Sequence, residues 1–147
     1  MVERKFGLGV VICIFNRDFS KIFLLKRNEE KRDRNKADWG NVGGKVELGE
    51  KLIDACVREA SEEIGVKLNP EKIKLLEIVE QPHITEVYHA LHFIYASILD
   101  EKEKFCINDE SDECNWFDLN KLPDKMLDSK EDIKRFSVLA KKVFEKF

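Results

Sequence analysis

The chain has 147 residues, of which 43% are hydrophobic and ten are phenylalanine, and its formal net charge is −3. This length fits a single domain with its own core, and the apolar content excludes intrinsic disorder as the overall state. The slight acidity argues against nonspecific binding to DNA or to a membrane surface, because both need surplus cations. We expect one domain over residues 1–147, for which small phosphorylated ligands brought in by a metal ion are not excluded.

The cysteines indicate a reducing compartment. Cys13, Cys56, Cys106 and Cys114 match no zinc-site spacing, so we expect four small, buried, reduced side chains and a cytoplasmic location. No stretch approaches the roughly 20 apolar residues of a membrane span. We therefore expect no membrane partner.

The first part of the chain predicts a hairpin followed by a charged loop. Residues 10–15 form a continuous apolar run typical of a buried strand, and residues 21–26 are its partner strand after a turn at 16–20. Residues 27–38 are strongly charged and predict a solvated loop, with a cationic rim for phosphate as the alternative. Residues 39–50 carry four glycines, which indicates unusual dihedral angles or a close backbone approach.

The rest of the chain predicts a helix, strands and a closing helix. Residues 51–64 form an amphipathic helix that ends at Gly65. Residues 73–79, 87–99 and 115–119 are the expected strands. One face of the closing helix is apolar and consists of Ile133, Phe136, Ala140, Val143 and Phe147. This order predicts a mixed sheet with helices packed against it.

Carboxylates gather on the first of these helices. Glu59 faces Glu62 and Glu63 at i+3 and i+4, about 5–6 Å away, where like charges repel, and Glu50 lies at the helix start. A cation relieves this repulsion, and Mg²⁺ prefers such hard oxygen ligands while retaining waters for exchange. The alternative is a solvated charged face with ordinary ion pairs, including Arg58 with Glu62 at i+4.

The spacing of these residues resembles a known signature. The segment reads Gly44, five residues, Glu50, seven residues, Arg58-Glu59-Ala60, one residue, Glu62-Glu63, one residue, Gly65-Val66. It is similar to the signature of the Nudix (MutT-like) hydrolases at every fixed position. This box, residues 44–66, covers about a sixth of the chain. The resemblance implies an α/β/α sandwich around a mixed sheet, with the box as a loop–helix–loop.

The resemblance also implies a chemistry. The family hydrolyses nucleoside diphosphates linked to a further group, with Mg²⁺, or Mn²⁺ as its substitute, holding the phosphate oxygens. Glu59 and Glu63 match the principal metal ligands, and Glu62 matches a carboxylate that acts as ligand or as base. Glu50 is expected near the metal, and the carbonyl of Gly43 or Gly44 is expected to complete its shell.

Two further catalytic roles follow from the resemblance. Arg58 matches the arginine that orients a catalytic carboxylate. The family's general base often lies outside the box, in a loop before a late strand, and residues 108–113 form that loop here. We expect Glu113 as the first candidate for this base and Glu110 as the second, with an acidic surface loop as the alternative.

The substrate side departs from the common pattern. Many members have Leu-Pro-Gly-Gly where this chain has Asn41-Val42-Gly43-Gly44, and the missing proline should loosen the turn slightly. Gly43 is expected at the substrate. Lys45 either reaches a phosphate or is a solvated lysine. Asn41 either faces the base pocket or satisfies the turn.

The substrate class is less sharply indicated. The acidic stretch 110–113 before residues 116–117 resembles that of the sanitising triphosphatases, which favours a nucleoside triphosphate, oxidised forms included, cleaved to monophosphate and pyrophosphate. Against this, residues 125–128 lack the tryptophan and paired aspartates of a purine pocket. Pro82 lies sixteen positions beyond the box, as in some ADP-ribose pyrophosphatases. Dinucleoside polyphosphates and capped RNA are further alternatives.

A protein without catalysis is the alternative of a different class. A silent Nudix domain would bind a nucleotide without cleaving it, and such members usually lack one of the box carboxylates, which are all present here. We expect a small nucleotide as partner, no DNA, and a monomer or homodimer. His83, His89 and His92 have no metal-type spacing and are expected to be packing or surface residues.

Overall fold

The computed structural model describes residues 3–145. The strands are β1 (Lys5–Phe15), β2 (Lys21–Arg27), β3 (Trp39–Gly40), β4 (Val42–Lys45), β5 (Lys74–Thr85), β6 (Tyr88–Ile98) and β7 (Ser111–Asp118). The helices are α1 (Glu29–Asn35), α2 (Leu52–Ile64) and α3 (Lys130–Phe144), with a 3-10 turn, η1, at Pro70–Lys72. No helix among residues 3–145 is both long enough and apolar enough to cross a membrane.

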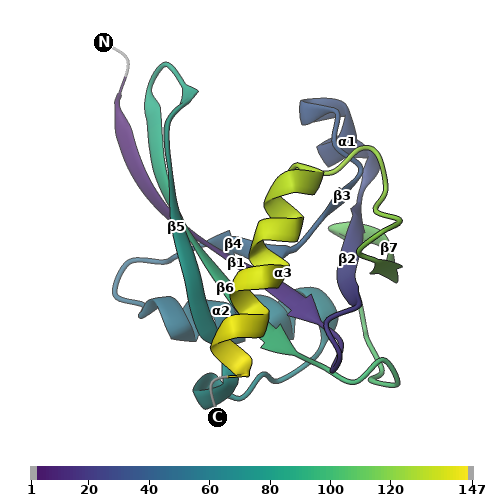
Figure 1. The fold of residues 1–147 in the computed structure, drawn as a ribbon. Helices are drawn as coiled ribbons and strands as arrows, with labels where there is room; N and C mark the ends of the chain where they lie inside the picture. The colour runs from purple at the N-terminus through teal and green to yellow at the C-terminus, as the bar shows by residue number, and fades with distance from the viewer. Residues whose placement is uncertain (1–2, 146–147) are drawn as a thin grey trace.

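The strands form one mixed sheet in the order β3-β2-β1-β6-β5, to which β4 adds beside β1 and β7 beside β2. β1 and β6 run parallel along their whole length, and the remaining pairs of named strands are antiparallel. Helix α3 lies across one face and α2 lies on the other (Figure 1). The expected α/β/α arrangement around a mixed sheet is confirmed.

The alternation of β1 divides the core into two layers. Val10, Ile12 and Ile14 pack in the layer that contains α2, whereas Cys13 and Phe15 pack in the layer that contains α3. All five are essentially inaccessible to solvent. This run is continuous in sequence because the strand is covered on both faces.

Helix α2 starts one residue later than expected, at Leu52, and ends at Ile64 as expected. Its buried face includes Cys56, Ala60 and Ile64. Gly65 terminates it with a φ of 67°, and its N–H donates to the Ser61 carbonyl. A left-handed residue at this position is the common way to end a helix.

The charged segment 27–38 was expected to be a loop, and this is wrong for its middle part. Helix α1 forms there without a single buried residue, so no apolar periodicity announces it. The Asn28 side chain caps it by accepting from Lys31 N–H, and its first turn is acidic while its last turn is basic. Both features stabilise a helix through its unpaired amides and its dipole.

Several strand boundaries also differ from the sequence expectation. The glycine-rich segment 39–50 contains the short strands β3 and β4 rather than only a turn. Pro82 and His83 lie within β5, not in a loop, and β7 begins at Ser111 instead of 115. Long antiparallel pairing of β5 with β6 and of β7 with β2 extends these strands, because ladder hydrogen bonds do not require apolar residues at every position.

The cysteines match the sequence expectation in part, and the buried face of the closing helix matches it within the described residues. All four cysteines are free, but only Cys13 and Cys56 are buried; Cys106 is exposed and Cys114 is half-buried. Helix α3 buries Ile133, Phe136 and Ala140 as expected. Phe147, assigned to the same face, lies outside the described residues.

We predict that Gly65→Ala destabilises the fold by about 2–3 kcal/mol, because it adds left-handed strain to steric overlap. A Cβ at this position would lie 2.9 Å from Cys106 Cβ. Gly49→Ala is the matched control, since Gly49 also has a positive φ but has no atom within 4 Å of its added Cβ. It should cost about 1 kcal/mol from strain alone. Urea unfolding of both variants tests this, and equal losses would contradict the role of the Cys106 contact.

Candidate active site

Two glycines bring the chain backbone against the carboxylates of α2. Gly43 and Gly44 pair with Val11 and Val10 of β1. A Cβ on Gly43 would lie 2.3 Å from the Val10 carbonyl oxygen, and one on Gly44 would lie 2.4 Å from Glu59 Oε1. No residue other than glycine fits at either position without displacing its neighbours.

Glu59 and Glu63 are buried in this contact, with 9% and 7% of their surfaces exposed. The Gly43 N–H donates to Glu63 Oε2 at 3.1 Å. Burial, and then the charge of Glu59, raises the pKa of Glu63 to about 8, although the Gly43 hydrogen bond opposes this shift. Burial also raises the pKa of Glu59, against the lowering effect of Arg58. Burial therefore opposes ionisation of both carboxyl groups, and the charge of Glu59 adds to this at Glu63.

Arg58 joins the remaining carboxylates. Its Nε and Nη2 donate to the two oxygens of Glu50 at 2.7 and 3.0 Å, and its Nη1 donates to Glu59 Oε1 at 2.9 Å. The expected pair with Glu62 is also present, at 3.3 Å. The strongest partner is Glu50, because the bidentate geometry adds directional specificity to charge. The hydrogen bonds from Arg58 hold the pKa of Glu50 below its ordinary value.

These residues have the donor atoms that a divalent cation prefers, but their side chains are not gathered around one point. Within residues 3–145, no group of three or more His, Cys, Asp or Glu side chains is gathered closely enough to hold a metal ion. Arg58 occupies oxygens of Glu50, Glu59 and Glu62. The donors are nevertheless all oxygens, and Glu59 and Glu63 form a buried acidic pair that a cation would neutralise. Hard ions such as Mg²⁺ and Mn²⁺ favour such a donor set.

Comparison with known proteins decides the family. The NUDIX domain model matches residues 5–137 of this chain. The chain belongs to the Nudix (MutT-like) hydrolase family. It is 34% identical over 118 residues to the ADP-ribose pyrophosphatase of Methanocaldococcus jannaschii, with 80% of this chain and 66% of that protein covered.

The chain is also similar to two further proteins. Identity to the 8-oxo-dGTP diphosphatase of Escherichia coli is 33% over 73 residues, which covers 50% of this chain and 54% of that enzyme. The crystal structure of a MutT NUDIX hydrolase from Burkholderia pseudomallei superposes with a TM-score of 0.72 at 24% identity, covering 88% of this chain and 96% of that one. The latter establishes the fold alone. The chain spans less than two thirds of the length of the two enzymes matched by sequence.

The structure distinguishes the two carboxylates of the 108–113 segment. Glu113 lies on β7, not in a loop, and its carboxylate is 4.0 Å from Lys26 Nζ on β2. Glu110 precedes the strand, and its charge contributes to the raised pKa of Glu63. Each of the two carboxylates thus has a lysine within 4.0 Å, since Lys31 Nζ lies 3.8 Å from Glu110 Oε2, and the charge of Glu110 adds to the raised pKa of Glu63.

The substrate-side residues of the sequence analysis fall in two places. Asn41 Nδ2 donates to Asp128 Oδ2 at 3.1 Å, while Asn41 Oδ1 is buried without a hydrogen-bond partner. Lys45 Nζ lies 5.8 Å from the centre of the Tyr88 ring, a cation–π distance. Tyr88 occupies the space above Gly7, where a Cβ would lie 1.9 Å from its hydroxyl oxygen. Neither Asp128 nor Tyr88 has a sequence signal, because both contacts join segments far apart in the chain.

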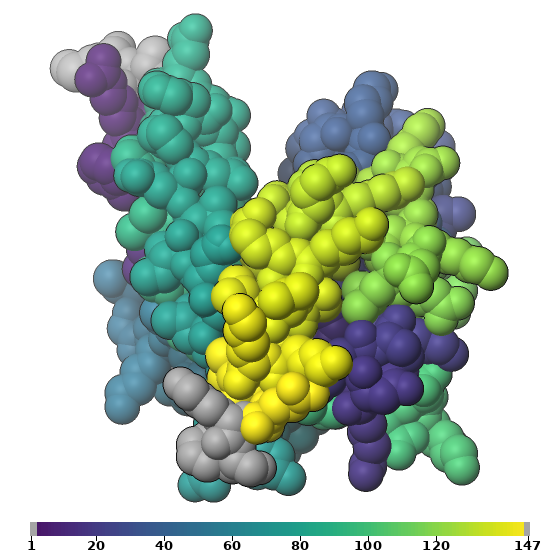
Figure 2. Space-filling model, in the orientation of Figure 1, coloured from purple at the N-terminus to yellow at the C-terminus, as the bar shows by residue number. Residues whose placement is uncertain are grey.

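Asp128 is a further partly buried carboxyl group, outside the Nudix box. Burial raises its pKa, whereas the Asn41 hydrogen bond and the charge of His92 lower it. It immediately precedes Ser129, the N-cap of α3. Figure 2 shows a hollow between the β5–β6 hairpin and α1, and the amino-terminal end of α3 borders it.

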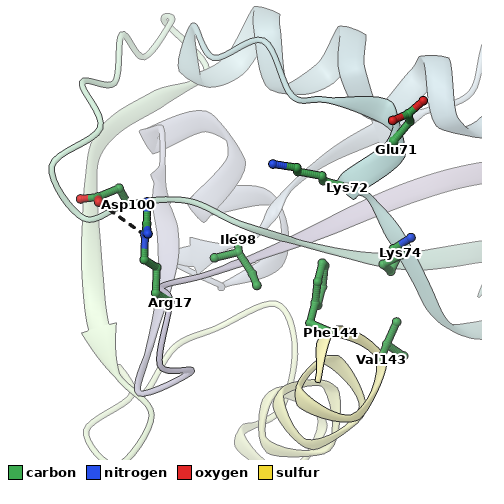
Figure 3. A pocket seen from close by; sticks show the side chains of 8 residues that line it. All are labelled: Arg17, Glu71, Lys72, Lys74, Ile98, Asp100, Val143 and Phe144. Atoms are coloured by element: carbon green, nitrogen blue, oxygen red, sulfur yellow. Dashed lines mark ion pairs between the residues drawn. The ribbon is translucent and has the colours of Figure 1, made fainter. Parts of the chain in front are cut away.

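A separate cavity of about 550 Å³ lies near the carboxyl end of α3 (Figure 3). Ile98, Val143 and Phe144 form its apolar part, and Arg17 in its wall pairs with Asp100 at 3.6 Å. None of the predicted site residues lines it. The Nudix box and this cavity are distinct features of the surface.

We predict that Glu63→Gln stabilises the metal-free protein at alkaline pH. The free energy of unfolding of the unaltered protein should fall as the pH rises from about 4.5 towards about 8, because the carboxyl ionises in the unfolded chain while it stays protonated in the folded one. Glutamine keeps the shape and the acceptor for Gly43 but does not ionise. Chemical unfolding between pH 4 and 9 with a chelator measures this effect.

The control for this measurement is Glu62→Gln. The Glu62 side chain is 56% exposed, so its replacement should leave the pH dependence intact. Equal slopes in both variants and in the unaltered protein would show that Glu63 is not the buried acid responsible.

Proposed function

We propose that this protein hydrolyses a pyrophosphate bond in a nucleoside diphosphate-linked compound, with Mg²⁺ as its cofactor and Mn²⁺ as a substitute. The observation that carries the proposal is the buried pair of Glu59 and Glu63 beneath the backbone of Gly43 and Gly44. A buried acidic pair costs stability without a cation. Membership of the Nudix family supplies the reaction class.

The residues of the Nudix box have different proposed roles. A bound divalent ion would neutralise the phosphate oxygens and acidify a water molecule. Glu59 and Glu63 are the first residues to hold it, with the Gly44 carbonyl and Glu62 as further oxygen donors. Arg58 keeps the carboxylates of Glu59 and Glu50 in fixed positions through its hydrogen bonds.

Glu110 is the residue we assign as general base. Its charge acts on Glu63, and its amide donates to Asn108, whose side chain is bonded to the Glu62 carbonyl of α2. A base outside the box leaves the box carboxylates free to bind the cation. Glu62 is the alternative base, since its side chain is exposed beside Arg58.

For the substrate we propose a nucleoside triphosphate, including oxidised forms, that is cleaved to monophosphate and pyrophosphate. Asn41 and Asp128 support this choice. The buried amide oxygen of Asn41 has no hydrogen-bond partner, and the Asp128 carboxyl bonded to the same side chain is partly buried. Asn41 lies two positions before Gly43. Such acceptors suit a base with adjacent N–H donors, as guanine has on its N1 and N2 edge. Similarity to the E. coli 8-oxo-dGTP diphosphatase points the same way.

ADP-ribose is the second candidate. The M. jannaschii ADP-ribose pyrophosphatase matches this chain over a longer stretch than the E. coli enzyme does. A groove of about 460 Å³ beside the box offers room for a second sugar moiety, and Lys45, Glu50 and Tyr88 are among its lining residues.

The first experiment is a product assay with Mg²⁺ on canonical and oxidised triphosphates, ADP-ribose, dinucleoside polyphosphates and capped RNA. We expect turnover of triphosphates that stops with a chelator. Glu59→Gln and Glu63→Gln should each lower kcat by at least about 100-fold, since each weakens charge stabilisation worth several kcal/mol.

Glu71→Gln, on the exposed turn η1, is the matched control and should retain full activity. Preferred turnover of ADP-ribose would replace the triphosphate by the second candidate. Absence of turnover on every compound, with nucleotide binding retained, would reject the enzyme and leave a binding domain.

We predict that Asp128→Asn raises KM for guanine triphosphates by about 10- to 100-fold, the usual effect of losing one good base contact, with a smaller change in kcat. Adenine triphosphates should be affected less. Asp124→Asn, whose side chain is 93% exposed and pairs with Lys130, is the control. An unchanged guanine-to-adenine ratio of kcat/KM in Asp128→Asn would contradict base recognition at this residue.

A further inference from the structure

Helix α1 and the loop that carries Glu110 are joined by a dense set of contacts. Asn28 N–H donates to the Glu110 carbonyl at 3.1 Å, and Asn28 Nδ2 donates to the Asp109 carbonyl at 3.1 Å. Arg32 Nη1 lies 2.6 Å from Asp112 Oδ2. The loop therefore has backbone and side-chain contacts to the α1 segment on one side.

The same loop is fixed to the catalytic helix on its other side. Asn108 Nδ2 donates to the Glu62 carbonyl in the last turn of α2 at 2.9 Å. The Asn108 Oδ1 accepts from the Glu110 N–H at 3.0 Å. Glu110 thus follows a residue bonded to α2 and precedes the strand that pairs with β2.

Helix α1 also contacts Arg27 of β2, whose Nη1 donates to the Lys31 carbonyl at 3.3 Å. The helix is seven residues long and buries none of them, and an isolated helix of this length is unstable in water. Its stability depends on the Asn28 cap and on the loop that it contacts. Asn28 serves both purposes, because its Oδ1 accepts from Lys31 N–H while its Nδ2 holds Asp109.

The charged contacts alone do not fix the loop. Lys31 Nζ and Glu110 Oε2 are 3.8 Å apart, and the Glu110 side chain is 51% exposed. Exposed ion pairs contribute little. The two hydrogen bonds from Asn28 to the Asp109 and Glu110 carbonyls are directional, so they restrict where the loop backbone lies.

We propose that α1 is a clamp that positions Glu110, with Asn28 and Arg32 as its positioning residues. This rests on the proposed function, in which Glu110 takes the proton of the attacking water. Asn28 and Arg32 do not touch the substrate. They restrict the loop that Asn108 joins to the last turn of α2, and a small misplacement of the Glu110 carboxylate is costly to the rate.

Asn28→Ser separates the clamp from simple helix capping. Serine is a good N-cap acceptor for Lys31 N–H, but it is too short to replace the amide donor to Asp109. We expect kcat to fall by about 10- to 100-fold and KM to change less than threefold, which marks loss of positioning without loss of substrate binding.

A double variant shows whether Asn28 acts through Glu110. Asn28→Ser combined with Glu110→Gln should have the kcat of Glu110→Gln alone, because the second change removes the group that the first misplaces. Multiplicative losses would show that Asn28 acts elsewhere and would overturn the clamp.

Asn69→Ser is the matched control. Asn69 caps η1 by accepting from Glu71 N–H, and it lies on a segment other than the clamp or the box. Its kcat should equal that of the unaltered protein. An equal loss in this variant would show that the effect of Asn28→Ser is general destabilisation.

Hydrogen exchange keeps the clamp testable apart from activity. Without substrate, the amides of Glu110 and Ser111 should exchange at least about tenfold faster in Asn28→Ser, because their acceptors on Asn108 become less well fixed. Unchanged exchange would overturn the clamp. Faster exchange with unchanged kcat would overturn the positioning role, and complete lack of turnover in the unaltered protein would overturn the proposed function while the exchange result still decides whether α1 holds the loop.

Discussion

The confinement of two carboxylates, Glu59 and Glu63, beneath a glycine backbone is the constraint on which the site depends. Both side chains are almost fully buried, and a Cβ at Gly44 would overlap with Glu59. The pairing of β4 with β1 fixes this backbone, while the apolar face of α2 fixes the carboxylates. The sheet and the helix therefore hold a charge conflict in place, and the fold must offset it.

The positive charge of Arg58 partly offsets the repulsion between these carboxylates. Arg58 binds Glu50 with two hydrogen bonds and reaches only one oxygen of Glu59, while Glu63 receives nothing stronger than the Gly43 amide. Burial therefore dominates at Glu63 and raises its pKa to about 8. Arg58 therefore relieves the repulsion at Glu59 only through one oxygen and does not reach Glu63. The result is a carboxyl group with a strongly raised pKa in the Nudix box, and such groups cluster at functional sites.

Sequence patterns predict the layers of this fold well and its charged parts poorly. The run from Val10 to Phe15 and the apolar face of α2 predicted buried elements, because burial selects residue types at a fixed period. The sequence pattern did not predict helix α1, because this helix is stabilised by the Asn28 cap and by contacts to a loop some 80 positions away. Glu113 was expected in a loop but lies on β7, because the start of this strand depends on pairing with β2, which leaves no periodic signal in an acidic stretch.

The sequence likewise predicts the class of reaction better than it predicts the substrate. The box lies on one turn and one helix, so local spacing carries it completely. Asn41, Glu110 and Asp128, in contrast, lie on three segments that meet only in the folded chain. Loops placed on a rigid frame vary without disturbing the frame, and in the proposed function recognition of the base and placement of the proton acceptor depend on them. The class of reaction can therefore be predicted from 23 consecutive residues, whereas the identity of the nucleotide depends on contacts between residues far apart in the chain.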